Sequence, residues 1–103
     1  MKIALVLSDT AVADILEQGD WYQGRSGGKL AQRWESAVTN TLLRILKNPL
    51  SGASCNFKST ELAEVRRMSI PGFPKHLIFY RFQDEQLQVL RIVHGARDLE
   101  SLF

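Results

Sequence analysis

The chain has 103 residues, of which 45% are hydrophobic and 23% are charged, and its formal net charge is +2. This length suits one compact domain and is too short for two, and the apolar content excludes an intrinsically disordered chain. The single cysteine, Cys55, excludes an internal disulfide, and no Cys/His cluster has metal-ligand spacing, so we expect neither a metal site nor a cofactor.

The N-terminus begins like a secretory signal, with Lys2 ahead of an apolar run at residues 3–7. The run is too short for a signal peptide, and Ser8-Asp9-Thr10 ends it without a small-residue cleavage pattern. No other apolar run approaches the roughly twenty residues that span a bilayer. We therefore expect a strand at residues 3–7 and a cytoplasmic protein that does not associate with membranes.

Two helices are predicted next. Ser8 is a suitable N-cap for a helix over residues 9–23, with Asp9 in its first turn. A glycine-rich turn at residues 24–28 precedes a second helix over residues 28–47, which Pro49 ends. The short turn predicts an antiparallel helical hairpin. The apolar stripe of the second helix comprises Leu30, Trp34, Ala37, Val38, Thr41, Leu42, Ile45 and Leu46.

The second half of the chain is predicted to be β-structure. Residues 48–60 have a loop composition, and strands are expected at residues 64–70, 75–82 and 87–94. Residues 71–74 (Pro-Gly-Phe-Pro) form a turn, residues 83–86 join the last two strands, and the tail at 98–103 adds a helical turn. The expected fold is a single α+β domain over residues 1–103, in which the N-terminal strand and the helical hairpin precede a three-stranded antiparallel meander.

The last hairpin predicts which residues share a face. A four-residue loop at 83–86 places Phe82 opposite Leu87, and directly opposed residues lie on the same side of the sheet. The face expected under the helices comprises Leu77, Phe79, Leu90 and Ile92. The opposite face comprises His76, Ile78, Tyr80, Phe82, Leu87, Val89, Arg91 and Val93. If it is uncovered, this second face is an apolar patch of the kind that binds partners.

Several short motifs in this region occur together in one family. They are Arg66-Arg67, Gly72-Phe73-Pro74, Tyr80-Arg81 within the strand 76–81, Leu87 with residues 89–91, and the run His94-Gly95-Ala96-Arg97-Asp98-Leu99. With Ala13-Asp14-Ile15, Asn48-Pro49 and Gly52 upstream, the chain resembles the RelE/ParE toxins over nearly its whole length. It is most similar to the ParE branch, and the fold of that family has the element order predicted above.

The resemblance implies the toxin of a type II toxin–antitoxin system, a class that includes plasmid stabilisation systems. ParE toxins inhibit DNA gyrase by stalling it on cleaved DNA, whereas RelE toxins cut mRNA in the ribosomal A site. Both are neutralised by a cognate antitoxin whose flexible tail wraps the toxin, so a toxin–antitoxin hetero-oligomer is expected. An apolar sheet face is a suitable place for that tail to bind.

If the chain is an mRNA endonuclease, the residues that carry the chemistry are Arg67, Arg91 and His94. RNA cleavage needs an acid, a base and cations that stabilise the phosphorane, and the imidazole of His94 can supply either proton transfer. The favoured interpretation of His94 is structural, as a residue whose hydrogen bonds close the end of the strand. The ribonuclease branch is strongly basic, whereas this chain has five scattered lysines and ends in Leu102-Phe103. These departures favour the ParE-like function, which requires binding alone; the enzyme remains the alternative.

Partner binding is predicted at His76, Ile78, Tyr80, Val89, Arg91 and Arg97. Arg91 has a second interpretation, as an arginine at the rim of the sheet with a buried stem. Trp21 is a candidate for target binding, while Tyr22 is expected to pack inside the helical hairpin.

Overall fold

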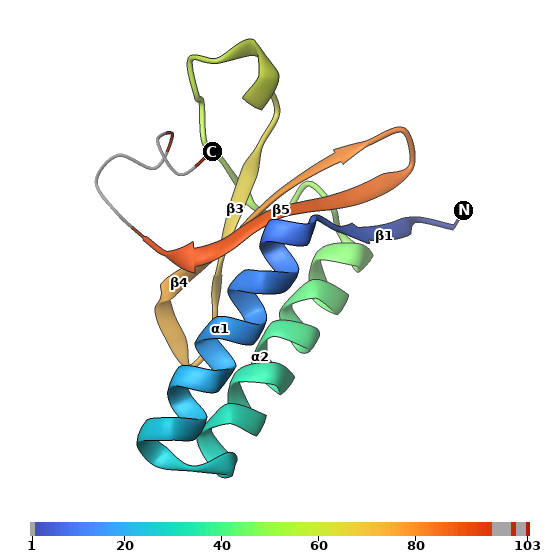
Figure 1. Cartoon of the computed structure of the whole chain (residues 1–103). Coiled ribbons are helices and arrows are strands. Elements are labelled where there is room, and N and C mark those ends of the chain that lie inside the picture. The colour runs from blue at the N-terminus through green and yellow to red at the C-terminus, as the bar shows by residue number, and fades with distance from the viewer. Residues whose placement is uncertain (1, 96–99, 101–102) are drawn as a thin grey trace.

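A layer of two helices packs against one mixed β-sheet (Figure 1). The computed structural model describes residues 2–95, 100 and 103. The elements are β1 (Ala4–Leu7), α1 (Asp9–Ser26), α2 (Gly28–Lys47), β2 (Ala53–Ser54), the 3₁₀ turn η1 (Thr60–Leu62), β3 (Arg66–Ile70), β4 (Phe73–Gln83) and β5 (Gln86–His94). The predicted α+β class and the predicted order of the main elements are confirmed.

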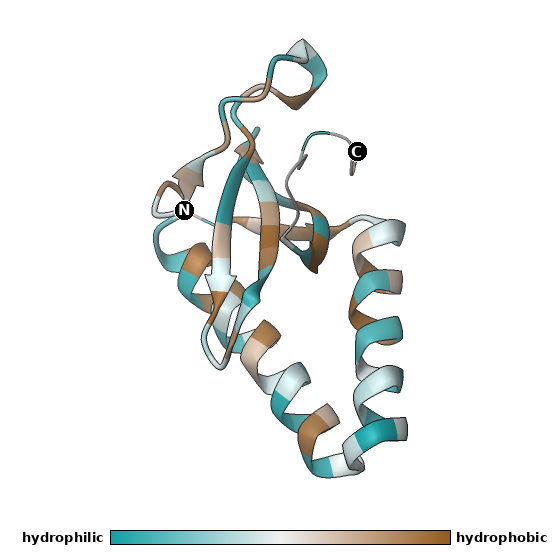
Figure 2. Ribbon diagram, turned by 90° about the vertical axis from the view of Figure 1, so that its left-hand side faces the viewer, coloured by the Kyte–Doolittle hydropathy of each residue, from teal (hydrophilic) through white to brown (hydrophobic). Residues whose placement is uncertain are grey.

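The helical hairpin forms as its capping residues predict. Ser8 is the N-cap of α1, and its hydroxyl accepts a hydrogen bond from the backbone N–H of Ala11 at 2.9 Å. The turn between the helices is shorter than expected, because α1 continues through Gly24 and only Gly27 leaves helical geometry, with φ at 81°. Both helices alternate polar and apolar residues along their length (Figure 2). Within the described part of the chain, no helix is both long enough and apolar enough to cross a membrane.

The sheet has the strand order β1-β5-β4-β3-β2. The three long strands β3, β4 and β5 form the expected antiparallel meander. Two strands extend it at its edges: β1 pairs in parallel with β5 from Ala4↔Gln86 to Leu7↔Val89, and the two-residue β2 pairs with β3. The sequence of β2 has no strand pattern, and so its pairing was not expected.

The main core lies between the helices and one face of the sheet. Trp34 and Ile45 of α2 are fully buried there against Ile78 and Tyr80 of β4. The Trp34 ring lies edge-on to His76 and Phe73, with centroid distances of 4.9 and 5.2 Å. The predicted core position of Trp34 and the buried position of Tyr22 are therefore confirmed.

The predicted assignment of sheet faces is wrong. Ile78 and Tyr80, expected on the open face, lie under the helices, while Phe79 lies on the other side. The predicted pairing holds from Phe82↔Leu87 to Tyr80↔Val89, and then a β-bulge intervenes, so that Phe79 pairs with Arg91. The extra residue in β5 moves the side chains that follow it to the opposite face of the sheet. Ile92 therefore lies in the core as predicted, whereas Leu77, Phe79 and Leu90, which were predicted to share its face, do not belong to this core.

The face away from the helices is also covered. Phe79 is fully buried, and its ring packs against Phe57 of the 55–63 loop and against Phe103. Glu100 holds this loop, since its carboxylate accepts hydrogen bonds from the backbone N–H groups of Lys58 and Ser59 at 2.9 and 3.2 Å. The predicted helical turn at residues 98–103 lies mostly outside the described residues. The covered surface around Phe79 means that this face is not the open apolar patch that the sequence suggested.

Candidate functional site

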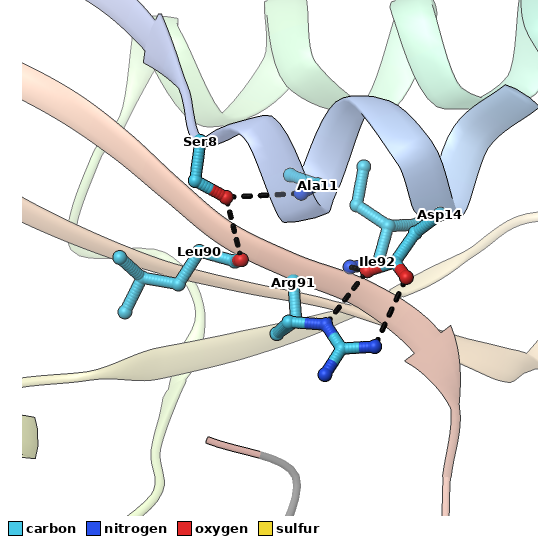
Figure 3. A network of polar contacts seen from close by, with 6 residues as sticks. All are labelled: Ser8, Ala11, Asp14, Leu90, Arg91 and Ile92. Carbon is cyan, nitrogen blue, oxygen red and sulfur yellow. Dashed lines mark hydrogen bonds and ion pairs between the residues drawn. The ribbon is translucent and has the colours of Figure 1, made fainter.

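The first helix takes the place of a missing strand along the edge of β5 (Figure 3). The strand β1 ends at Leu7, whose partner is Val89. Beyond that point, no strand among the residues that the structure describes pairs with the outer edge of β5. The backbone N–H of Ser8 donates to the carbonyl of Val89 at 3.0 Å, and the Ser8 hydroxyl donates to the carbonyl of Leu90 at 2.8 Å. The start of α1 thus satisfies backbone groups that an unpaired strand edge would expose.

Asp14, six residues further along the chain in α1, completes this contact. Its carboxylate accepts hydrogen bonds from Nε and Nη2 of Arg91 at 2.8 and 3.0 Å, and from the backbone N–H of Ile92 at 3.0 Å. The side chains of Asp14 and Arg91 are 9% and 23% exposed. The hydrogen bond to Asp14 is the main cause that raises the pKa of Arg91 above its ordinary value. The bidentate, half-buried pair therefore fixes α1 to β5.

A groove of about 690 Å³ lies beside this pair, between α1 and the end of β5. His76 and His94 meet edge-on in it, with 5.4 Å between their ring centroids. Burial lowers the pKa of His76, and the neighbouring His94 lowers it further. Trp21 borders the groove with 52% of its surface exposed, and the Arg25 guanidinium lies 4.7 Å from its ring centroid. Trp21 thus remains available to a partner.

The three candidate ribonuclease residues do not converge on one site. Arg67 and Arg91 both pair with Phe79, so their backbone positions belong to the face turned away from the helices, with the buried Phe79 between them. His94 pairs with His76, whose side chain packs against Trp34 on the helix-covered face. Arg91 and His94 border the same groove, but Arg67 does not.

The residues predicted to bind partners are mostly interior. Ile78, Tyr80 and Val89 have no exposed surface, and His76 is 8% exposed, because the helices cover this face. The expectation of an open face made from them is therefore corrected. Arg91 stays at the surface, bound to Asp14. Arg97 lies outside the described residues.

Several motif residues hold loops in place. The Tyr80 hydroxyl accepts a hydrogen bond from the backbone N–H of Gly52 at 2.8 Å. A Cβ at Gly52 would overlap that hydroxyl and would lie 2.8 Å from the backbone oxygen of Arg67. Arg66 donates to the carbonyl of Gly52 at 2.9 Å, and Arg81 donates to the carbonyl of Glu61 at 2.9 Å. The arginines and tyrosine of the motif set thus carry much of the loop architecture.

Asp14 is the site residue that sequence reasoning did not single out. It follows Ala11 by three residues, and Ala11 is fully buried, so the carboxylate lies on the inward side of α1. A carboxylate at such a position requires a cation or backbone donors, which the sequence pattern alone does not place. In the part of the chain that is described, no group of three or more His, Cys, Asp or Glu side chains is arranged to hold a metal ion.

Comparison with known proteins identifies the family. Residues 5–99 match the sequence model of the ParE toxin of the type II toxin–antitoxin system, parDE. The structure is similar to the chromosomal ParDE TA system from P. aeruginosa, with a TM-score of 0.75 and 18% identity over 91% of this chain and 97% of that one. It is also similar to the isolated E. coli RelE toxin, with a TM-score of 0.58 and 10% identity over 97% of this chain and 92% of that one.

Among curated proteins, no sequence is significantly similar to this chain. The two structural matches show the shared fold, and the family match covers nearly the whole sequence. The chain belongs to the ParE toxins of type II toxin–antitoxin systems.

Proposed function

We propose that this toxin inhibits DNA gyrase by binding, in the ParE manner, and that it does not cut mRNA. The observation that carries the proposal is the separation of Arg67 from His94. Arg67 lies on the sheet face turned away from the helices, next to Phe79. His94 lies at the end of β5, beside His76. General acid–base catalysis requires its groups within about 3 Å of the reacting atoms, directly or through one water.

The role of Arg91 supports the same conclusion. Stabilising a phosphorane requires a cation that is directed at the phosphate. Arg91 instead directs Nε and Nη2 at the Asp14 carboxylate, which neutralises its charge and fixes α1 to β5. The match to the ParE family is a further, independent support.

We also propose where the cognate antitoxin docks, since the sheet face first expected to bind it is buried. Exposed apolar side chains follow one another along β1 and the first half of α1. They are Leu5, Val6, Val12 and Leu16, with 39% to 58% of their surfaces exposed. In addition, β1 is the terminal strand of the sheet, and its outer backbone edge can accept one further strand from the antitoxin tail.

Assays with purified components test the proposed function. The toxin is incubated with gyrase, ATP and relaxed plasmid, and supercoiling and double-strand breaks are measured. In parallel, the toxin is incubated with translating ribosomes, and mRNA ends are mapped by primer extension. We expect gyrase-dependent DNA breaks and intact mRNA. Codon-phased mRNA cuts without DNA breaks would show that the proposal is wrong.

A further inference from the structure

The two helices carry opposite charge. Helix α1 has a single cation, Arg25, and four carboxylates, at Asp9, Asp14, Glu17 and Asp20. In α2 the balance reverses, with four cations against the single carboxylate of Glu35. The small net charge of the chain therefore conceals a strong separation of charge between adjacent elements.

The cations of α2 form one row along the helix. Lys29, Arg33, Arg44 and Lys47 fall, with Ser36 and Asn40 between them, at steps of three and four residues. At 3.6 residues per turn these six positions lie within an arc of about 80°, and the row is about 27 Å long. Glu35 is on the opposite side of the helix. The row presents cations and hydrogen-bond donors, with no carboxylate among its six members.

A groove runs along this row. It has a volume of about 620 Å³ and lies between α2 and the β3–β4 turn at residues 71–73. Lys29, Arg33 and Arg44 line it together with Ser36 and Asn40, while Ala37 and Phe73 supply apolar surface. No ion pair or side-chain hydrogen bond within the described residues involves the three cations. Their charge is thus available to a ligand outside the chain.

We propose that this row is a binding site for the phosphate backbone of duplex DNA. Backbone phosphates are contacted by lysine and arginine and by serine and asparagine donors, which is the composition of the row. Duplex DNA carries one charge per about 1.7 Å of axis, so it meets cations at both ends of a straight row of this length. The proposed DNA site goes beyond the proposed inhibition of gyrase and does not depend on it.

The test is DNA binding by the toxin alone, without gyrase. Anisotropy of a labelled 20-base-pair duplex is measured between 50 and 200 mM salt, where three phosphate contacts predict a log–log slope of about −3. The variant R33Q/R44Q should bind at least about tenfold more weakly at 50 mM salt and lower the magnitude of the slope by about 2. The control K2Q/K58Q removes the same charge from exposed positions outside the row and should change affinity less than about threefold.

Three results would overturn the proposal. The first is no measurable binding to the duplex at 50 mM salt, and the second is an equal loss in the control variant. The third is a preference of tenfold or more for poly-glutamate or for duplex RNA of equal length, which would assign the row to a protein or RNA partner. Both variants change exposed side chains, and a thermal unfolding curve confirms that each is folded. Gyrase inhibition is measured separately, so either proposal can fail while the other holds.

Discussion

A few side chains join elements that are far apart in the sequence, and Asp14 makes the most extensive of these contacts. Its carboxylate joins α1 to the side chain of Arg91 and to the backbone of Ile92. The first helix reaches the sheet edge through this residue and through Ser8. Removing the carboxylate leaves both a half-buried guanidinium and a backbone N–H without this acceptor.

We expect Asp14→Ala to lower the free energy of unfolding by about 2–3 kcal/mol, since hydrogen bonds to charged groups contribute about 1.5–3 kcal/mol. Urea denaturation measures the change. The matched control is Asp20→Ala at an exposed position of the same helix, away from the groove that Arg91 borders, which should stay within about 0.5 kcal/mol of wild type. Equal values for the two variants would show that the Asp14–Arg91 pair contributes no net stability.

Gly52 and Tyr80 form a second such contact. Gly52→Ala is expected to cost about 1–3 kcal/mol, because the added methyl group overlaps the Tyr80 hydroxyl. Tyr80→Phe should cost about 1 kcal/mol through the lost hydrogen bond. In the double variant the hydroxyl is absent and the overlap is partly relieved, so the two costs should sum to more than the measured total. Strict additivity in a double-mutant cycle would contradict this geometry.

The buried imidazole of His76 makes stability depend on pH. Burial and His94 lower its folded-state pKa below the ordinary value of 6.5, so the unfolded chain takes up the proton more readily. Its contribution is therefore complete above pH 6.5 and is lost as the pH falls from there toward the folded-state pKa. Between pH 7.5 and 5.5, urea denaturation should show wild type losing stability and His76→Phe losing less. His94→Gln should keep most of the dependence, since burial is the larger cause.

Capping residues and hydrophobic periodicity predict the helices and the antiparallel meander. They do not predict which face of the sheet the helices cover or which strands pair at its edges, because both depend on contacts between residues far apart in the sequence. Both faces of β4 carry apolar side chains, so alternation alone does not show which one the helices cover. The bulge at Leu90 then inverts half of β5. The sequence identified Arg91 and His94 as candidates but not the partner of Arg91, because Asp14 is 77 residues away in the chain.

The exposed apolar side chains of α1 are part of the proposed antitoxin site. Replacing Val12 and Leu16 by aspartate should weaken binding of the cognate antitoxin at least tenfold, because both side chains lose apolar contact and the carboxylates are desolvated. Isothermal titration calorimetry measures the affinity. The variant Gln32→Asp/Asn40→Asp adds the same charge to exposed positions of α2 and serves as the control. Equal losses in both variants would place the antitoxin elsewhere or point to a general charge effect.

The whole molecule presents different chemistry on each helix. The first helix offers exposed apolar side chains and carboxylates, and the second offers a row of cations beside a groove. The residues that would have to cooperate in RNA cleavage are divided between sheet faces or held in structural contacts. The proposed antitoxin site on β1 and α1 and the proposed DNA site on α2 are thus separate surfaces of the molecule.

The most direct measurement follows DNA and mRNA in the same cells after brief induction of the toxin without its antitoxin. Plasmid DNA is assayed for breaks that disappear when gyrase carries a target-site substitution, and mRNA ends are mapped at ribosomal A-site codons. We expect gyrase-dependent breaks with intact mRNA, and the same result from the variant Arg67→Gln/His94→Gln. Codon-phased mRNA cuts that this variant abolishes, with intact DNA, would contradict gyrase inhibition and assign catalysis to those residues.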